Sequence, residues 1–224
     1  MIRIENTEIV GWKAAIRGMR NPLNSWDKSD SYTTHIEDAE TLETADFEFF
    51  VGDNDLALMK KLRNAGTDHR KFMRMIAVYV DITAPLYWWK EFDTYKVGTV
   101  ANSCSTMHKI HAKEFTLDDF SHEHLLLHPS VEALHWVVEA LNISRMAYLE
   151  CKNPIAKKDW WWQMIQLLPS SYNQKRTVML NYEVLANMYK SRKDHKLNEW
   201  VDLCKWIESL PYSELITGKD EPNG

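Results

Sequence analysis

The chain has 224 residues, of which 45% are hydrophobic and 26% charged, and its formal net charge is −5. It is too apolar for a disordered chain and long enough for one sizeable core, so we expect a single domain over 1–224. The acidic balance gives no general attraction to nucleic acid, and no stretch approaches the ~18 apolar residues of a membrane span. We expect neither nucleic acid nor a membrane as a partner, although a local basic site for a phosphate-bearing small ligand stays open.

The cysteines indicate a reducing compartment. There are three, an odd number at wide spacings without a C-x-x-C pair: Cys104, Cys151 and Cys204. This pattern favours free thiols over a disulfide framework or a structural zinc site. The first residues lack a basic segment followed by an apolar one, as a secretory signal would have. We therefore expect a cytoplasmic protein.

The first part of the chain is predicted to mix strands with a loop. Residues 1–12 and 46–52 alternate apolar and polar side chains over a short length, which is typical of strands. Residues 20–33 are rich in Asn, Ser, Asp and Pro, which predicts a loop.

The remainder is predicted to be mainly helical. Residues 53–66 begin with Asp and Asn, repeat apolar residues at helical spacing and end in Gly, and Pro85 is expected to end or kink the helix that follows. The apolar periodicity predicts helices over 53–66, 68–82, 105–115, 128–150, 158–168, 174–192 and 197–210, with a break at 169–173. The predicted fold class is therefore α+β, a mostly helical domain with a small antiparallel sheet.

Three features suggest chemistry but have ordinary explanations. His122, His124 and His128 suggest a metal site, but their spacing is not that of H-E-x-x-H, and we prefer a solvated loop and predict no metal. Cys104 could be a nucleophile, but no nearby base is evident, so a small buried cysteine is preferred. The three tryptophans at 160–162 cannot all lie on one helix face, so at least one is expected to meet a partner or second subunit.

Residues 94–109, "TYKVGTVANSCSTMHK", are almost all small or uncharged in a chain rich in large side chains. From composition alone this segment is either a solvated loop or a place where backbone and short polar side chains approach a ligand. Arg192 is the other notable residue, because Asn181, Leu185, Met188 and Arg192 are spaced for one helix face. A buried guanidinium on that face needs an anionic partner, either a ligand phosphate or carboxylate or a carboxylate of the chain itself.

Several segments, in order along the chain, resemble flavin-dependent thymidylate synthases, the ThyX family. "ETADFEFF" at 43–50 is similar to the family's "EHASFTF" strand, and "LLPSSY" at 167–172 is similar to its "LPLSTY". Tyr95 to Met107 falls on the signature R-H-R-x-x-S-x-N-x-x-S-x-R. "NYEVLANMYKSR" resembles "NARSLMNFLNLR" with four residues at identical spacing, namely Asn181, Leu185, Asn187 and Arg192. The resemblance covers most of the chain, with an extra helical segment at about 52–84.

The departures from the family pattern concern its charged residues. In the signature Asn102 and Ser105 are retained. The residues that replace family residues are Thr44, Tyr95, Lys96, Val97, Val100, Ser103, Met107 and Glu183. Of the cationic positions that the family uses on flavin and nucleotide phosphates, Lys96 and Arg192 remain cationic. Each charge-assisted contact to a phosphate is worth about 1.5–3 kcal/mol, so the lost arginines matter.

The resemblance implies a homotetramer that binds FAD across subunit boundaries and reductively methylates dUMP, or a related pyrimidine nucleotide, with methylene-tetrahydrofolate as carbon donor and NADPH as reductant. It assigns Arg192 and Ser105 to catalysis. It assigns the same two residues and Ser103 to nucleotide binding. It places Lys96 on a flavin phosphate and Asn102, Asn181 and Asn187 on the flavin. The alternative hypothesis is a non-catalytic or repurposed protein of the same fold, a ligand-binding or structural protein that has lost the flavin chemistry.

Overall fold

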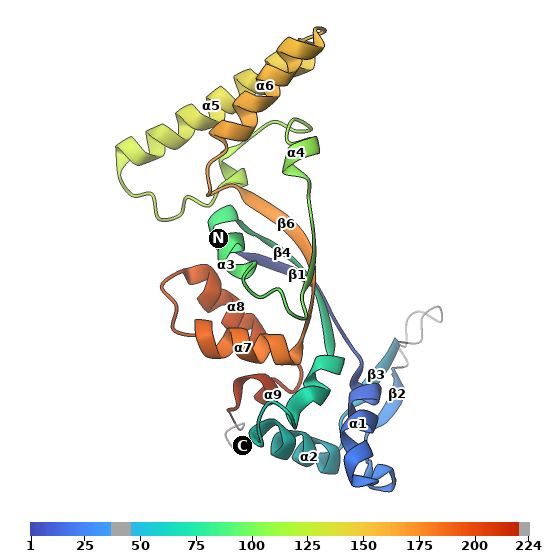
Figure 1. Ribbon diagram of the computed structural model, residues 1–224. Coiled ribbons are helices and arrows are strands. Elements are labelled where there is room, and N and C mark those ends of the chain that lie inside the picture. The colour runs from blue at the N-terminus through green and yellow to red at the C-terminus, as the bar shows by residue number, and fades with distance from the viewer. Residues whose placement is uncertain (37–45, 220–224) are drawn as a thin grey trace.

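A four-stranded antiparallel sheet in the order β1-β4-β6-β5 runs through the protein, as seen in a computed structural model that describes residues 1–36 and 46–219 (Figure 1). Its strands are β1 (Arg3–Val10), β4 (Ala77–Pro85), β5 (Val100–Ser103) and β6 (Asn173–Asn181). A separate two-stranded sheet pairs β2 (Tyr32–Ile36) with β3 (Asp46–Phe50). The predicted strands over 1–12 and 46–52 and the predicted α+β class are confirmed, while Glu43, Thr44 and Ala45 of the family-like strand segment lie outside the described residues.

The two central strands are the main correction to the sequence prediction. The helix expected over 68–82 is a short 3₁₀ helix, η3 (Arg70–Met75), followed by β4, and the helix expected over 174–192 begins only at Tyr182. Val78, Val80 and Ile82 are buried and lie opposite Leu180, Val178 and Arg176 of β6. Alternating β-branched residues favour a strand once a partner strand is available, and tertiary pairing prevails over a periodicity that also fits a helix. Within the 52–84 segment, therefore, only the part before β4 is helical. That the 52–84 segment is an insertion relative to the ThyX family stays a prediction.

Helices cover one face of the sheet. The helices α3 (Leu86–Phe92), α7 (Tyr182–Arg192) and α8 (Asn198–Glu208) lie together on one side in Figure 1. Trp88 and Trp200 are fully buried between them, with ring centroids 4.8 Å apart. Pro85 was expected to end or kink a helix; it is instead the last residue of strand β4 and directly precedes α3. Burial of such large aromatic side chains supplies much of the stability of this core.

The opposite face of the sheet is open. Tyr79 of β4 and Val100 of β5 point to this face, and they are 42% and 55% exposed. Two residues further along β4, Asp81 accepts a hydrogen bond from Thr177 (2.6 Å) and forms an ion pair with Lys175 (2.9 Å). Hydrogen bonds from Thr177, Lys175 and Asn6 lower the pKa of Asp81 to about 2. The open face is thus polar and charged at neutral pH.

A helical hairpin projects from one end of the sheet (Figure 1). It consists of α5 (His128–Glu150) and α6 (Pro154–Leu167), close to the helices predicted there. Its inner residues form a second apolar cluster with Ile110, Phe115 and Phe120. Trp161 packs on that cluster, whereas Trp160 and Trp162 are 39% and 40% exposed, which agrees with the expectation that the three rings do not share a face.

The helix predicted over 105–115 is also shorter than expected. It forms one turn, α4 (Thr106–Lys109), and the following residues bend toward α5. The backbone N–H of Phe115 donates to the side chain of Asn142 on α5 at 2.9 Å, and the Phe115 ring enters the second cluster. Docking on α5 therefore ends this helix early. The remaining segments are η1 (Asn21–Leu23) and η2 (Trp26–Lys28) within the predicted loop, η4 (Leu117–Asp119) and the helices α1 (Trp12–Arg20), α2 (Asp53–Asn64) and α9 (Glu214–Thr217).

None of the helices in the described ranges has the length and apolar character that crossing a bilayer requires.

A buried ion pair joins α1 to α2. Arg20 donates to Asp55 at 2.6 Å, and both side chains are less than 5% exposed. The hydroxyls of Ser29 and Ser31 each donate to the other carboxylate oxygen at 2.7 Å. Burial raises the pKa of Asp55, but hydrogen bonds from Ser31, Ser29 and Arg20 outweigh burial and hold it below 3.8. The pair is thus hydrogen-bonded well enough to stay ionised in the interior.

Replacing Asp55 with Ala is expected to lower the free energy of unfolding by about 3–5 kcal/mol, because it leaves the Arg20 charge buried and unpaired. Denaturant unfolding at neutral pH measures this loss. Asp53→Ala is the matched control, since Asp53 is exposed in the same helical turn and its loss costs at most about 1 kcal/mol.

The stabilisation by Asp55 is also expected to depend on pH. Because its pKa is lowered on folding, its contribution is fully present above the ordinary value of 3.8 and is lost as the pH falls through the lower folded pKa. The difference between wild type and Asp55→Ala should therefore stay constant from neutral pH down to about 3.8 and shrink in stronger acid; a difference that grew there would contradict the assignment.

Candidate functional site

The segment 94–109 forms the edge of the sheet and the turns on either side of it. Its middle, β5, pairs with β6 so that Asn102 lies opposite Thr177 and Ser103 opposite Arg176. The backbone N–H of Cys104 extends the ladder to the Lys175 carbonyl at 2.9 Å. This stretch is therefore an ordered strand edge.

The turn before β5 packs on the N-terminus of α7. Gly98 has φ +77°, and a Cβ there would lie 2.9 Å from the side-chain nitrogen of Asn181 and 3.1 Å from a methyl of Val184. Only glycine combines this backbone conformation with so close an approach. Lys96 lies in the same turn, is exposed and has no ion pair within the described residues.

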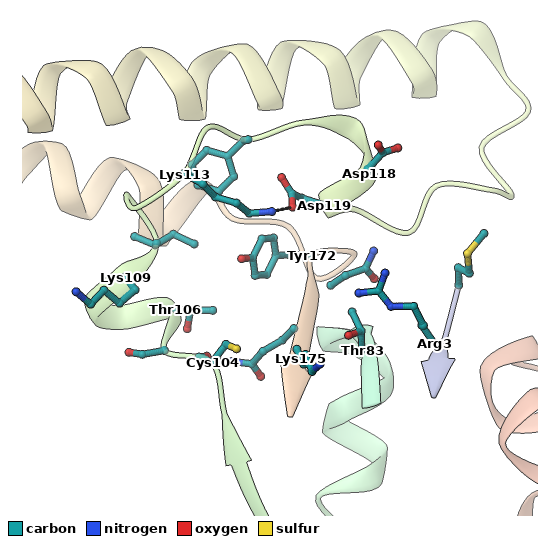
Figure 2. A pocket seen from close by; sticks show the side chains of 16 residues that line it. Arg3, Thr83, Cys104, Thr106, Lys109, Lys113, Asp118, Asp119, Tyr172 and Lys175 are labelled. Atoms are coloured by element: carbon teal, nitrogen blue, oxygen red, sulfur yellow. Dashed lines mark hydrogen bonds and ion pairs between the residues drawn. The ribbon is translucent and has the colours of Figure 1, made fainter. Parts of the chain in front are cut away.

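The turn after β5 borders a pocket of about 570 Å³ between the end of the sheet and the base of the helical hairpin (Figure 2). Ser105 lines this pocket and caps α4, since its hydroxyl oxygen accepts the His108 N–H at 3.0 Å. Cys104 lines it too and is exposed, so the preferred interpretation of a buried cysteine is wrong. The cause is its position just beyond the last residue of an edge strand, where no layer covers it.

The pocket carries four cationic side chains whose charge is largely compensated. They are Arg3, Lys109, Lys113 and Lys175. Lys113 contacts Asp119 in the pocket wall, as Figure 2 shows, and Lys175 lies 2.9 Å from Asp81. Arg3 lies 3.2 Å from Glu5, whereas Lys109 has no ion pair within the described residues. A ligand phosphate could therefore form an ion pair directly with the Lys109 ammonium. It could contact the other three cations only by displacing their carboxylate partners.

Two hydroxyls complete the pocket. The side-chain oxygen of Thr83 is buried and has no hydrogen-bond partner among the described residues, which is costly unless a ligand or water supplies one. Burial raises the pKa of Tyr172, with further contributions from Asp119 and Cys104, so its hydroxyl stays protonated and can donate to a ligand. Donors and cations in a concave site are suited to an anionic polar ligand.

Arg192 lies outside this pocket and is already paired. Its guanidinium donates to Glu91 at 2.7 Å and to the Tyr95 hydroxyl at 2.9 Å, and it lies 4.6 Å from the ring centroid of Trp200. The Trp200 indole N–H donates to the same oxygen of Glu91 at 2.9 Å. Of the two partners predicted for Arg192, the intrachain carboxylate is therefore the one present.

The predicted residues on α7 are placed differently from one another. Asn181 does not share a helix face with Leu185, Met188 and Arg192, because it is the last residue of β6 and the N-cap of α7, accepting from the Val184 N–H at 3.0 Å. Asn187 is on the helix, and its side-chain oxygen accepts from Arg70 at 3.3 Å. Within one chain, then, Ser105 lies at the pocket, Asn102 and Ser103 lie in β5, and Lys96 lies in the turn before that strand. Asn181 and Arg192 lie at the two ends of α7, and Asn187 lies within the helix.

Sequence reasoning missed the partners that fix these residues. Glu91 determines the position of Arg192, and Arg70 lies beside Asn187 and forms an ion pair with Glu183 at 2.9 Å. These partners are 101 and 113 residues apart in sequence from the residues they contact, so no local spacing reports them. Glu183 was the available signal, because a carboxylate in the first turn of a helix that becomes buried needs a cation.

The histidines are arranged as ordinary polar side chains. His122 contacts the carbonyl of Phe120 at 2.9 Å, and His124 contacts the side chain of Asn198 at 3.2 Å. Within residues 1–36 and 46–219, no group of three or more His, Cys, Asp or Glu side chains is arranged to hold a metal ion.

Two solved structures have the same fold over almost the whole of both chains. Thymidylate synthase X (ThyX) from Helicobacter pylori with FAD and dUMP has a TM-score of 0.66 at 16% identity, covering 97% of this chain and 98% of that chain. Flavin-dependent thymidylate synthase ThyX from Helicobacter pylori complexed with FAD and dUMP has a TM-score of 0.63 at 17% identity, covering 96% and 98%. No protein-family model and no curated protein matches the sequence. At this level of identity the comparison establishes the fold, and the chain has the fold of ThyX.

Proposed function

We propose that the protein binds FAD and dUMP and catalyses the flavin-dependent reductive methylation of dUMP, or of a related pyrimidine nucleotide, with methylene-tetrahydrofolate as carbon donor and NADPH as reductant. The observation that carries the proposal is the match of nearly the whole chain to the fold of two proteins described with FAD and dUMP. When bound, the flavin supplies the hydride, and the protein supplies binding, orientation and charge.

The pocket beside α4 receives the nucleotide. Ser105 donates a hydrogen bond to its phosphate or base, and Lys109 supplies an uncommitted charge in the same pocket. Ser103 does not line the pocket itself; it is the last residue of β5, two residues before Ser105, and is proposed to reach the nucleotide from there. The unpartnered hydroxyl of Thr83 gains a partner from the same ligand. A protonated Tyr172 donates without adding charge.

The flavin contacts come from polar groups that are still available. The side chain of Asn102 and the amide nitrogen of Asn187 make no hydrogen bond within the described residues, and Lys96 carries an exposed charge for a flavin phosphate. Asn181 has a structural part as well, because its oxygen caps α7 and its nitrogen faces the Gly98 carbonyl. It acts on the flavin by fixing the turn that carries Lys96.

Ser105 and Arg192 act on one nucleotide only when they come from different subunits. In one chain Arg192 contacts Glu91, Tyr95 and Trp200, and it does not line the pocket of Ser105. A homotetramer in which sites form across subunit boundaries brings the two together. The nucleotide phosphate then replaces the Glu91 carboxylate as the partner of the Arg192 guanidinium, so the positive charge of Arg192 stays paired with an anion.

The helical hairpin provides an apolar surface for that assembly. Trp136 and Ile143, seven residues apart on one face of α5, are 66% and 60% exposed, and Met146 beside them is 48% exposed. Exposed apolar patches of this kind mark protein–protein contacts, and a stable contact buries about 800 Å² per partner. This surface is therefore the proposed subunit contact.

One set of observations favours the alternative, a protein of this fold that has lost the flavin chemistry. Val97, Val100 and Met107 stand where the resemblance has arginine, serine and arginine, and they are 91%, 55% and 47% exposed. Exposed apolar side chains at three positions of the signature suit a protein contact better than a phosphate site. The binding experiment below separates the two functions.

Purified protein incubated with FAD and then desalted is expected to keep a flavin absorbance spectrum. Addition of dUMP to this complex should raise the melting temperature further, because a ligand that binds the folded state stabilises it by mass action. Release of the hydrogen at uracil C5, dependent on methylene-tetrahydrofolate and NADPH, then tests the reaction. A protein that stays colourless and shows no thermal shift with either ligand has the alternative function.

Replacing Arg192 with Ala is expected to weaken dUMP binding by roughly 10- to 100-fold while leaving flavin retention unchanged, since a charge-assisted contact to phosphate is worth about 1.5–3 kcal/mol. Titration calorimetry of the flavin-loaded protein measures it. Arg176→Ala is the matched control, because Arg176 is likewise paired with a carboxylate, Asp93, and lies over a tryptophan, Trp89. Equal losses in both variants would show a general effect on the helix layer, and Arg192 would have no specific role.

The wild-type protein is expected to have a mass in solution near four times 26.4 kDa by light scattering. The double variant Trp136→Glu, Ile143→Glu should dissociate to smaller species, because it buries two carboxylates in the proposed contact. Trp26→Glu changes a tryptophan that is 52% exposed outside the hairpin and should leave the mass unchanged. A wild-type monomer would contradict the proposed assembly.

A further inference from the structure

A second pocket lies between α1, the loop that carries η2, and strands β2 and β3, at the end of the molecule away from the helical hairpin (Figure 1). Its volume is about 400 Å³, which is in the range of small-molecule sites. The described residues that line it include three aromatic and three cationic side chains, namely Trp26, Tyr32, Phe49, Lys13, Arg17 and Arg20. No Asp or Glu is among these described lining residues, so the pocket combines aromatic walls with positive charge.

Two of the aromatic rings are exposed and are nevertheless held in place. Trp26 and Tyr32 are 52% and 59% exposed. The Trp26 indole N–H donates to the side chain of Asn21 at 2.8 Å, and the Tyr32 ring stacks on Phe50 with the ring centroids 5.4 Å apart. Exposed rings in a fixed orientation offer a surface to a planar ligand, and little side-chain freedom remains to be lost when the ligand binds.

Two of the three cations are uncompensated within the part of the chain that the structure describes. Lys13 and Arg17 are exposed, lie one turn apart on the same face of α1, and form no ion pair with a described residue. Arg20 is committed, because its guanidinium donates to Asp55 at 2.6 Å and to the Lys28 carbonyl at 3.0 Å. Two positive charges are therefore left for a ligand at the α1 side of the pocket.

The helix dipole does not explain the position of Lys13. Lys13 lies in the first turn of α1, where the dipole disfavours a cation, and no acidic residue stands in that turn. Arg17 lies in the last turn, where the dipole does favour it. A cation that gains nothing from its own helix and pairs with no described carboxylate is suited to an anion supplied by a ligand.

We propose that this pocket binds a planar aromatic molecule that carries a carboxylate. The ring of the ligand packs against Trp26 and Tyr32, and its carboxylate contacts Arg17 and Lys13, since a guanidinium matches a carboxylate with two parallel hydrogen bonds. The proposal stands apart from the function proposed above, because no residue that lines this pocket is assigned there.

Titration calorimetry at low salt compares 2-naphthoate with 2-naphthamide, which has the same rings and nearly the same shape but no charge. The wild-type protein is expected to bind 2-naphthoate saturably and about tenfold or more tightly than the amide, because the contact to the carboxylate is charge-assisted. The double variant Lys13→Ala, Arg17→Ala should lose this difference and bind both ligands with the weaker affinity. Both side chains are exposed, so this variant is expected to fold normally.

Two further variants separate the charge from the rings. Lys71→Ala, Arg74→Ala is the matched control, since it removes one exposed lysine and one exposed arginine of η3, outside the pocket, and should bind 2-naphthoate as wild type does. Trp26→Ala should weaken the binding of both ligands by a similar factor, because it removes ring surface and leaves the charges in place.

Absence of saturable 2-naphthoate binding, equal wild-type affinity for acid and amide, equal losses in the two double variants, or unchanged binding in Trp26→Ala would each overturn the proposal. The result is separable from the function test, because the two ligands contain neither a flavin nor a pyrimidine. A protein that binds no dUMP and retains no flavin still distinguishes 2-naphthoate from 2-naphthamide if the pocket is as proposed.

Discussion

Strands β4 and β6 pair over nine residues each, from Ala77 opposite Asn181 to Pro85 opposite Asn173, and every site of the proposed function is attached to an end or an edge of this pair. At one end the Tyr182 N–H donates to the carbonyl of Ile76, and α7 begins at once. At the other end the Leu86 N–H donates to the carbonyl of Tyr172, which places a wall of the Ser105 pocket next to the start of α3. A slip of this pairing by one residue would exchange the buried and open faces of the sheet and separate these groups.

Helix α7 then carries charge at both ends, and in each case a distant residue pairs with it. Glu183 in the first turn is paired with Arg70, and Arg192 in the last turn is paired with Glu91. Both arrangements agree with the helix dipole, which favours an anion near the N-terminus and a cation near the C-terminus. Each end of α7 is therefore held by a charge from outside the helix, Arg70 at its first turn and Glu91 at its last.

The sequence predicted the elements whose local signals agree with their surroundings. The helices at 53–64, 128–150 and 198–208 carry apolar residues at helical spacing, and the first of them also has a clear start and stop. Strand β6 and helix α7 were merged because Val178, Leu185 and Met188 satisfy helical spacing across the boundary at Asn181. That boundary depends on β4, which is about a hundred residues away and was itself predicted to be helical. The site was predictable to the extent that it lies in one segment, as with Ser105, whereas the pairings of Arg192 and Arg70 depend on tertiary contacts.

The charge balance of the pocket of Ser105 decides which ligands it can discriminate. In the pocket of Ser105 three of the four cationic side chains contact carboxylates. A ligand phosphate therefore forms an ion pair with one of these three only where it displaces the carboxylate. Hydroxyls such as that of Thr83 then provide much of the recognition. Such a site discriminates between ligands by their hydrogen-bonding groups. An analogue that leaves a buried donor or acceptor of the pocket unpaired binds more weakly, because the desolvation of that group is not compensated. Arg192 does not line this pocket, so one ligand contacts both Ser105 and Arg192 only where the surfaces of two subunits meet.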